Sequence, residues 1–529
     1  MKIILLFGAG KSATVLIKYL LKKAPIMNWK LIVADANKEL VSQKLGGHPM
    51  SEALALDVKN EEERKLAIAK ADLVISLLPP HLHILVAKDC LTHGKHLFTA
   101  SYLDPEIESL QPEIQAKGLL FLYEMGLDPG IDHMSAMAIV DRIHKAGGTI
   151  KSFISHCGGL IAPQSDNNPW HYKISWNPAN VVAAGKQGAI FKQHNTLHNL
   201  PYKEVFESER IVDIDQVGKL AWYPNRNSIP YISLYKMEQA STFIRTTLRH
   251  PDFISGWKKL IDLGLTQDQP VFSVPTHSPS KFVLQFLAAT KQQEQYQKWL
   301  KEDSLFEKQI LSLGLQSNSF KIEKPSYSPA SLLQELMERN LGMNENDQDR
   351  VIMQHEFIYN LGKENYSLTS SLVLDGDNAV DTAMAKTVGL PLALAATFFL
   401  ENKIQLVGLH RPLSYVFYSQ ILPALEKEGI SCEVIDLRTV RPLDINSILE
   451  SVKKTNRLVI LEEAWPFGNV STEITYQVQQ KAFDYLDAPI MRLGGSESPI
   501  PYNPELEKAA VPQVPGIIEG LRNLVRGRM

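Results

Sequence analysis

Along the first quarter of the chain, apolar runs alternate with amphipathic stretches in the order expected for strands followed by helices. The run KIILLF enters a glycine turn and is followed by the helix-compatible ATVLIKYL. Three further apolar runs, WKLIVAD, DLVISLLPP and KHLFTASY, follow, with EEERKLAIAKA as a helical pattern between two of them. Continuous apolar runs are typical of parallel strands that are buried on both faces. Residues 1–125 therefore predict an α/β fold with a Rossmann-type doubly wound sheet.

The glycine turn FGAGKS has two possible interpretations. A nucleotide triphosphate-binding P-loop would need a glycine at position 5, where the chain has Leu5 inside an apolar run. The pattern G-x-G-x-x-A fits Gly8, Gly10 and Ala13, and the helix that follows would offer free N–H groups to a pyrophosphate. We interpret the turn as a dinucleotide-binding loop; the alternative is a tight turn whose glycines serve packing alone.

Asp35 ends the second apolar run, near the place where this fingerprint has an acidic residue for the adenosine ribose. A carboxylate facing the ribose would repel a 2′-phosphate. Taken alone, Asp35 favours NAD over NADP.

After residue 125 the pattern changes three times. Residues 126–375 contain strand-like runs (TIKSFISHCGG, YKISW, GAIFKQ, YKEVFES, HEFIYNL, YSLTSSLVLDG), which predict a mixed α+β substrate and dimerisation domain, with a helical insertion over about 255–345. Residues 376–430 contain the long helical pattern AVDTAMAKTVGLPLALAATFFLENK and form a return segment. From residue 431 to 529, CEVIDLRTVRPLD, RLVILEEAW and PIMRLGG predict a separate α/β unit.

Composition narrows the possible partners and the compartment. The 529 residues carry 55 basic and 58 acidic side chains, a formal charge of −3, so no nucleic acid partner is expected. Three widely spaced cysteines, without C-x-x-C or H-E-x-x-H, suit a reducing compartment and predict no metal site. The apolar stretch LPLALAATFFL is too short to span a bilayer and predicts a core helix. We expect a cytoplasmic protein without a membrane partner.

Four further stretches carry residues suited to chemistry. ASYLDP, with Ser101 and Tyr102, follows the fourth strand, where a sheet of this type lines its ligand crevice. EMGLDPGIDH contains Asp128 in a turn and Asp132 as a candidate helix cap. SHCGGL contains Cys157, for which plain packing is the simpler alternative. The last two stretches, YPNRNS and TFIRTTLRH, carry arginines that could bind carboxylates: Arg226, Arg245 and Arg249.

Together these motifs resemble one enzyme family. AxSY, ExGLDPGIDH, SxCGGL, YKxSW, YPNRxS and IRxTLR, in this order behind GxGxxA, resemble saccharopine dehydrogenase of the glutamate-forming type over about residues 1–430. The resemblance implies an oxidoreductase that interconverts saccharopine with glutamate and 2-aminoadipate 6-semialdehyde, in a direction that stays open, and a homodimer.

The resemblance also implies roles for individual residues. The substrate would be held by five of them: Ser101, Tyr102, Arg226, Arg245 and Thr246. The cofactor would lie against the glycine loop and the domain crossing: Gly8, Gly10, Lys11, Ser12, Ala13, Asp35, Leu127, Asp128, Pro129 and Trp176. Proton transfer is assigned, in order of preference, to Asp128, Tyr102 and Cys157.

The family generally uses NADP, whereas Asp35 favours NAD, so the coenzyme stays open between NADP and NAD. Lys38 is the nearby cation that could reach a 2′-phosphate.

The tail resembles a different family. EVIDLRTVRPLD, VKKTNRLVILEEAWPFGNVSTEI, FDYLDAPIMRLGG and PIPY, within residues 431–529, are similar to the C-terminal, transketolase-type domain of the pyruvate dehydrogenase β subunit. In that family the domain mediates subunit association, and the half that carries the thiamine-activating glutamate is absent here. The alternative function is therefore a subunit-association component of a 2-oxo acid dehydrogenase, without a thiamine site of its own. KIQLVGLH and YSQILPALEKEGI could complete either sheet.

Overall fold

The computed structural model describes residues 1–206, 210–215, 217–273, 278–319, 326–429, 441, 443–465, 467–497 and 510–513. These fall into two compact units. The first contains Met1–Tyr359 and Ser371–Cys432, and the second contains Asn360–Ser370 and Glu433–Met529.

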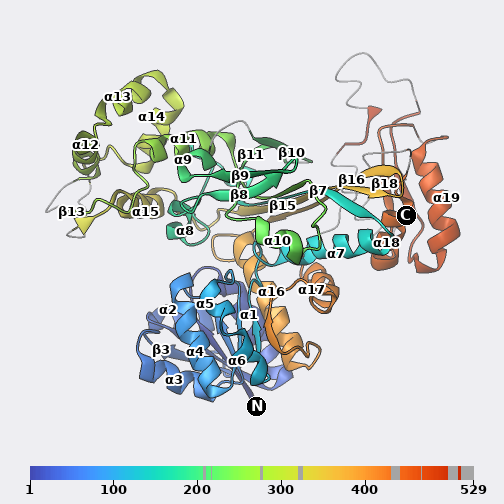
Figure 1. The fold of residues 1–529 in the computed structure, drawn as a ribbon, viewed down its shortest axis with the longest axis horizontal. Helices are drawn as coiled ribbons and strands as arrows, with labels where there is room; N and C mark the ends of the chain where they lie inside the picture. Colours follow the sequence, from blue (N-terminus) through green and yellow to red (C-terminus); the bar gives the residue numbers. More distant parts are fainter. Residues whose placement is uncertain are drawn as a thin grey trace. The chain divides into compact units, whose positions relative to one another are not determined.

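The N-terminal part of the first unit is a parallel sheet of seven strands, as predicted. Its order is β17 (Gly408–His410), β6 (Leu120–Leu122), β5 (His96–Thr99), β4 (Leu73–Ser76), β1 (Lys2–Phe7), β2 (Trp29–Asp35) and β3 (Ser51–Ala55). Strand order reverses between β1 and β4, which is where sheets of this type bind ligands. The helices of this region, seen in blue in Figure 1, are α1 (Ala13–Met27), α2 (Lys38–Leu45), α3 (Glu61–Lys70), α4 (His83–His93), α5 (Pro105–Glu108) and α6 (Gln111–Ala116).

A mixed sheet forms the second part of the first unit. Its order is β10 (Ile211–Ile214), β11 (Gly218–Pro224), β12 (Thr242–Arg249), β7 (Thr149–Ile161), β15 (Asp349–Leu361) and β16 (Glu364–Asp375), with β8 (Ala189–Gln193) pairing with β12 and with β9 (Thr196–Leu200). β12 runs parallel to β7 and antiparallel to β11. This mixture agrees with the α+β character expected from the sequence.

Short helices and a helical group surround this sheet. The short ones are α8 (Pro178–Val182), α9 (Tyr202–Val205) and α10 (Ile229–Leu234). Figure 1 shows the group in yellow-green: α11 (Pro251–Asp262), α12 (Pro279–Ala289), α13 (Gln293–Glu302), α14 (Ser304–Leu313) and α15 (Pro329–Asn340), with the two-residue strands β13 (Phe272–Ser273) and β14 (Ser326–Tyr327).

Two strand predictions in this region are wrong. YKEVFES contains helix α9, because Tyr202 packs with Val205 and Phe206 on one side of a single helical turn after Pro201. YKISW is extended, but Ile174 makes one isolated bridge to Gly342 rather than joining a sheet. Its carbonyl oxygen accepts instead from Lys11 (3.1 Å).

Three long helices complete the first unit: α7 (Ile131–Lys145), α16 (Ala383–Leu400) and α17 (Tyr415–Lys427). α16 packs against α1, and Gly389 permits the contact, since a Cβ there would lie 3.0 Å from the backbone nitrogen of Leu16. α16 is long and apolar enough to cross a membrane, yet 78% of it is buried inside the protein, as in a core helix.

The strand and helix that could complete either sheet belong to the first unit. β17 runs parallel to β6 in the seven-stranded sheet, and α17 packs against α7 and α16.

The second unit contains the adjoining ends of β15 and β16, Asn360–Ser370, and a small α/β structure. It contains α18 (Ile445–Thr455), β18 (Val459–Leu461), α19 (Val470–Ala482) and β19 (Met491–Leu493), with β18 parallel to β19. The predicted strand within CEVIDLRTVRPLD, and the PIPY motif, lie outside the described residues.

Candidate active site

The glycine loop connects β1 to α1 at the switch point of the first sheet. Gly8 has φ +96°, and a Cβ there would lie 2.8 Å from the carbonyl oxygen of Leu77, so the turn requires glycine. At Gly10 a Cβ would meet nothing within 4 Å. Ser12, the N-cap of α1, makes no side-chain capping bond, and Ala13 begins the helix. The loop therefore leaves space and backbone N–H groups of the kind that hold a pyrophosphate.

Asp35 lies at the end of β2, beside this loop. Its Oδ2 accepts from the backbone N–H of Ala9 (2.8 Å), and its Oδ1 accepts from that of Asn37 (2.9 Å). Both carboxylate oxygens therefore already have partners within the protein, and part of the role of Asp35 is to fix the glycine loop against β2.

Lys44 is a cation at this site that the sequence analysis did not single out. Its Nζ donates to the carbonyl oxygen of Gly10 (2.6 Å) and to Oγ1 of Thr14 (2.7 Å). Burial lowers its pKa to about 8, although the charge of Asp35 opposes this. Lys38, in contrast, is exposed in the first turn of α2. The sequence signal that could have identified Lys44 was its position in α2, the helix that follows Asp35 and whose Lys44 reaches the glycine loop.

Lys11 reaches from the glycine loop to the second part of the unit, where its Nζ contacts Ile174. Two residues further on, Trp176 is half-buried and donates from Nε1 to the hydroxyl of Tyr172 (3.0 Å). The structure therefore places YKISW next to the loop through Lys11.

Tyr102, Asp128 and Arg245, which are far apart in the sequence, meet in one buried cluster. The Tyr102 hydroxyl donates to Oδ1 of Asp128 (2.6 Å). Nη2 of Arg245 donates to the same Oδ1 (2.6 Å), to Oδ2 of Asp132 (2.9 Å) and to the Tyr102 oxygen (3.1 Å). Tyr102 follows β5, Asp128 precedes α7 and Arg245 lies on β12, so the cluster joins the parallel sheet to the mixed sheet.

The expectation that Asp132 caps α7 is wrong. The N-cap is Gly130, and Asp132 lies in the first turn, where its Oδ1 accepts from the N–H of Gly130 (2.6 Å). Its other oxygen is thereby held toward Arg245. Leu127 is buried before this turn, and the carbonyl oxygen of Pro129 closes it by accepting from Gly126 (2.8 Å).

Burial and charge act in opposite directions on the acids of the cluster. Burial raises the pKa of Asp128, whereas the Arg245 guanidinium lowers it. Burial also raises the pKa of Tyr102 well above its usual value, which keeps the phenol protonated. The protonated phenol of Tyr102 therefore stays a hydrogen-bond donor to Asp128, whose carboxylate is placed for acid–base chemistry at a neighbouring atom.

Two guanidinium groups have free capacity beside Tyr102. Arg226 is exposed, and its guanidinium lies over the Tyr102 ring, 4.9 Å from the ring centre. In the described part of the chain, this ring is the contact given for the Arg226 side chain. Arg245 is buried, and its Nε has no hydrogen-bond partner among the described residues. Both are suited to a ligand carboxylate.

Cys157 and Thr246 lie at the adjoining ends of β7 and β12. Cys157 stands opposite Thr247 in the parallel register, and Thr246 bonds through Oγ1 to Nδ1 of His156 (2.7 Å). Burial, with the negative charges of Asp128 and Asp132, raises the pKa of the Cys157 thiol well above its usual value. Cys157 is therefore a neutral thiol beside the cluster, which can donate a hydrogen bond but releases its proton with difficulty.

Ser101 ends a chain of hydrogen bonds that begins on β4. His83 bonds through Nδ1 to Ser76 (2.8 Å) and through Nε2 to Ser101 (2.7 Å). Burial lowers the pKa of His83 to about 4, so the ring is neutral at neutral pH. The bond from His83 thereby fixes the orientation of the Ser101 hydroxyl.

Glu124 is a second buried centre that the sequence analysis missed. It is fully buried, and its two oxygens take bonds from His133 (2.8 Å), Arg411 (2.9 Å), Tyr231 (3.2 Å) and the backbone of Leu103 (3.0 Å). Burial would raise its pKa, but the bond from His133 and the charges of His133 and Arg411 lower it to about 2. Its position directly after β6, at the carboxyl end of a strand, was the signal that could have found it.

The family models match this architecture in three segments. The description "Saccharopine dehydrogenase NADP binding domain" matches residues 4–122, and "Saccharopine dehydrogenase C-terminal domain" matches residues 126–430. The second segment alone covers more than half of the chain. This chain belongs to the saccharopine dehydrogenase family. The resemblance expected from the sequence is confirmed.

Individual family members agree with this result. The saccharopine dehydrogenase [NADP(+), L-glutamate-forming] of Schizosaccharomyces pombe is 32% identical over 447 residues, covering 81% of this chain and 98% of the relative. The apo structure of the Saccharomyces cerevisiae enzyme, described as saccharopine dehydrogenase (L-Glu forming), superimposes with a TM-score of 0.72 at 30% identity, covering 82% of this chain and 99% of the other.

The tail matches a different family, as expected. "Transketolase, C-terminal domain" matches residues 414–517. The pyruvate dehydrogenase E1 component subunit beta of Rhizobium meliloti is 51% identical over 98 residues, which is 18% of this chain and 21% of that protein. This saccharopine dehydrogenase family member therefore carries a second, unrelated domain.

Proposed function

We propose that the chain is a glutamate-forming saccharopine dehydrogenase that uses NADP. The observation that carries the proposal is the buried cluster of Tyr102, Asp128 and Arg245, placed where the carboxyl ends of the parallel strands meet the mixed sheet. The name of the Schizosaccharomyces pombe relative, which the chain matches along nearly its whole length, supports both the substrate and the coenzyme.

The free guanidinium capacity fits this substrate. Saccharopine has three carboxylates around a secondary amine. We assign them to Arg226, which is exposed, and to the unpartnered Nε of Arg245, with the hydroxyl groups of Ser101 and Thr246 beside them. Bidentate guanidinium contacts give such a substrate both affinity and a fixed orientation.

The glycine loop fits a dinucleotide, because it is open at Gly10 and adjoins an uncapped helix start. We assign the cofactor contacts to this loop and to the residues of the domain crossing, together with Trp176. The bound nicotinamide would accept a hydride from the carbon beside the substrate nitrogen.

The chain's own residues would handle the protons that follow. Removal of a hydride leaves an imine in the substrate, water adds to it, and the carbinolamine collapses to glutamate and the semialdehyde. Asp128 takes the proton from the attacking water, while Tyr102 holds Asp128 through their hydrogen bond. Cys157 is the weakest of the three candidates, since its raised pKa opposes release of the thiol proton.

The preference for NADP rests on Asp35 and Lys44. Asp35 is already bonded to two backbone N–H groups, so its charge is partly satisfied by the protein. Lys44 places a half-buried cation beside the loop, where it would attract a 2′-phosphate. We therefore assign to Lys44 the role that the sequence gave to Lys38.

The test is direct. Purified protein is incubated with saccharopine and either NADP⁺ or NAD⁺, and reduced coenzyme is followed by absorbance. We expect turnover with a lower KM for NADP⁺, and in Lys44→Met a KM for NADP⁺ raised about tenfold with that for NAD⁺ little changed. Lys38→Met is the matched control. No turnover with either coenzyme would refute the function, and an unaltered ratio in Lys44→Met would refute the coenzyme assignment.

For the tail we propose a role in subunit association, supported by its 51% identity to the Rhizobium meliloti subunit. Co-purification of the full chain with a thiamine-dependent 2-oxo acid dehydrogenase α subunit would support this role, and its loss on removal of residues 433–529 would localise it. The homodimer and the cytoplasmic location stay predictions.

A further inference from the structure

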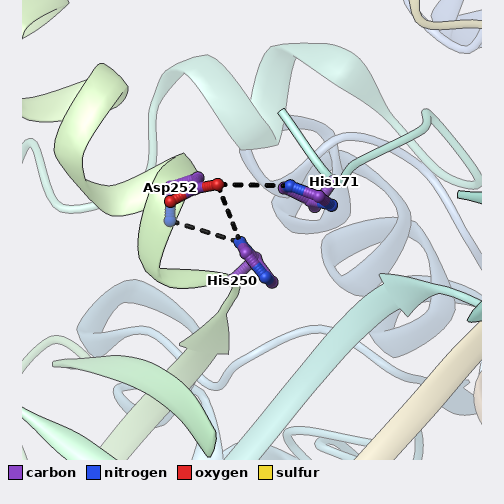
Figure 2. A group of neighbouring side chains, drawn as sticks. All are labelled: His171, His250 and Asp252. Carbon is purple, nitrogen blue, oxygen red and sulfur yellow. Dashed lines mark hydrogen bonds and ion pairs between the residues drawn. The ribbon is translucent and has the colours of Figure 1, made fainter. Parts of the chain in front are cut away.

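His171, His250 and Asp252 form a group of metal-ligand type outside the candidate active site (Figure 2). Their ligand atoms all lie within 4.8 Å of one another. His250 and Asp252 flank Pro251, where β12 passes into α11, and His171 lies in the connection between β7 and α8. Figure 2 shows Asp252 facing both imidazole rings. Nothing in the saccharopine reaction uses these side chains.

The distances suit one small cation. Oδ2 of Asp252 lies 3.3 Å from Nε2 of His171 and 3.8 Å from Nδ1 of His250. Ligand atoms about 2.0–2.1 Å from a tetrahedral zinc ion are about 3.4 Å apart, so these two separations are close to those of a zinc site. Nδ1 of His250 also accepts from the backbone N–H of Asp252 (3.3 Å) and thereby caps α11, a bond that it would exchange for the ion. Two imidazoles and a carboxylate are also the ligand types that zinc prefers.

A second carboxylate orients the first ligand. Nδ1 of His171 bonds to Oδ2 of Asp166 (2.6 Å), which directs Nε2 toward Asp252. The other oxygen of Asp166 is buried without a hydrogen-bond partner in the described part of the chain. A carboxylate behind a ligating histidine is the usual outer support of a metal site, because it fixes the tautomer and raises the basicity of the ring.

The neighbouring residues hold the two ligand segments together. The guanidinium of Arg249 lies over the rings of Tyr172 (5.2 Å) and Phe253 (5.5 Å), and these two rings also contact each other (5.3 Å). Tyr172 follows His171 and Phe253 follows Asp252. The backbone of the site is therefore fixed by packing before any ion binds.

We propose that His171, His250 and Asp252 bind a divalent transition-metal ion, with Zn²⁺ as the expected occupant and water completing its shell. Asp166 and Asp252 bring two carboxylates to the group, which favours a divalent cation. The ring centres of His171 and His250 are 3.8 Å apart, as in a stacked pair, so binding of an ion would require the two rings to turn until their ligand nitrogens face one point. Without an ion, the group is a stacked pair of histidines in which His171 bonds to Asp166 and His250 caps α11.

The ion would join the start of α11 to the segment that contacts the glycine loop. His171 is three residues from Ile174, whose carbonyl oxygen accepts from Lys11. We expect Zn²⁺ to raise the thermal unfolding temperature of the full chain for this reason.

The test uses the full chain purified without a polyhistidine tag, stripped with a chelator and titrated with Zn²⁺ by calorimetry. We expect one equivalent to bind, at least tenfold more weakly in Asp252→Asn and in His171→Asn, and about 10- to 100-fold more weakly in Asp166→Asn. His194→Asn is the matched control, because His194 is exposed and has φ 49° where His171 has 48°. Equal binding by the ligand variants and the control would overturn the proposal.

A second measurement does not depend on the variants folding. Crystals of the unaltered chain are soaked in Zn²⁺, and anomalous scattering is measured at the zinc edge. We expect a peak between the three side chains. Its absence there at saturating Zn²⁺ would overturn the proposal.

Discussion

The two units of this chain differ in how deeply they bury ion pairs and in which hydrophobic side chains they expose. The first unit buries ion pairs whose partners are both almost inaccessible: Arg64–Asp89, Lys173–Asp347 and Arg245–Asp132. The second unit has a small core around Ile448, Val452 and Val478, and the ion pair Lys453–Glu450, on its helix α18, is exposed. Buried pairs are costly unless other bonds complete them, and they fix one geometry. The first unit is built to hold a chemical site.

The large hydrophobic side chains that the second unit exposes are mostly aromatic, whereas those that the first unit exposes are mostly aliphatic. Trp465 is 53% exposed and Phe467 86% exposed, and the aromatic residues of α19 and the turn after it are also accessible: Tyr476, Phe483 and Tyr485. Aromatic residues at a surface are typical of protein interfaces. The contrast supports an association role for the tail and a catalytic role for the first unit.

The largest expected effect comes from Arg245→Leu, which leaves Asp128 and Asp132 without their buried cation. We expect about 3–5 kcal/mol of lost stability and a fall in kcat/KM of about 10³-fold, because both the pocket and the substrate lose a charged partner. Urea unfolding and saccharopine kinetics measure the two. Arg492→Leu in the second unit is the control and should leave kcat/KM within about twofold. Equal effects of the two variants would contradict the contrast between the units.

Glu124→Gln should remove a pH-dependent part of the stability. The pKa of Glu124 falls from 4.5 to about 2 in the folded chain, so its contribution is complete above pH 4.5 and is lost as the pH falls toward 2. This shift corresponds to about 3 kcal/mol. The unfolding midpoints of the variant and the unaltered chain should therefore differ most near neutral pH and converge as the pH falls toward about 3.

The exposed Glu450 provides the control for this prediction. Glu450→Gln should shift the midpoint little at any pH, because its pair with Lys453 is open to solvent. A pH-independent difference for Glu124→Gln would show that the carboxylate is not the group that titrates.

Tyr102→Phe tests the proton path with a smaller change. It removes the hydroxyl that donates to Asp128, a bond to a charged group worth about 1.5–3 kcal/mol. We expect kcat to fall about 30-fold, with a shifted pH profile. Tyr476→Phe, an exposed tyrosine of the second unit, should leave kcat unaltered. Wild-type turnover by Tyr102→Phe would remove Tyr102 from the mechanism.

The smallest effect is expected from removing residues 433–529. If the two units divide catalysis and association as proposed, kcat and KM should stay within about twofold, while binding to a partner subunit is lost. Loss of saccharopine turnover in the soluble truncated chain would show that the tail contributes to the site.

Local patterns predicted the parallel sheet and the glycine loop well. A strand that is buried on both faces and a turn that needs Gly8 can each be recognised from a few consecutive residues. The cluster of Tyr102, Asp128 and Arg245 has no such local pattern, since its members are 26 to 143 positions apart. The resemblance supplied what periodicity could not.

The missed and wrong predictions have physical reasons. Lys44 and Glu124 look like ordinary surface charges in the sequence, and only tertiary contacts bury them. YKEVFES has strand-forming residues, but Pro201 and the burial of Val205 with Phe206 select a helical turn. YKISW makes one isolated bridge and accepts a hydrogen bond from Lys11 instead of joining a sheet. Strand propensity alone cannot distinguish such a segment from a strand within a sheet.

α17 is claimed by both family models, since one ends at residue 430 and the other begins at 414, yet it is built into the first unit. The position of α17 therefore affects where the two halves can be separated. Cutting the chain before α17 would remove a packed helix from the dehydrogenase, whereas cutting after α17 would remove the first residues that the transketolase family model matches.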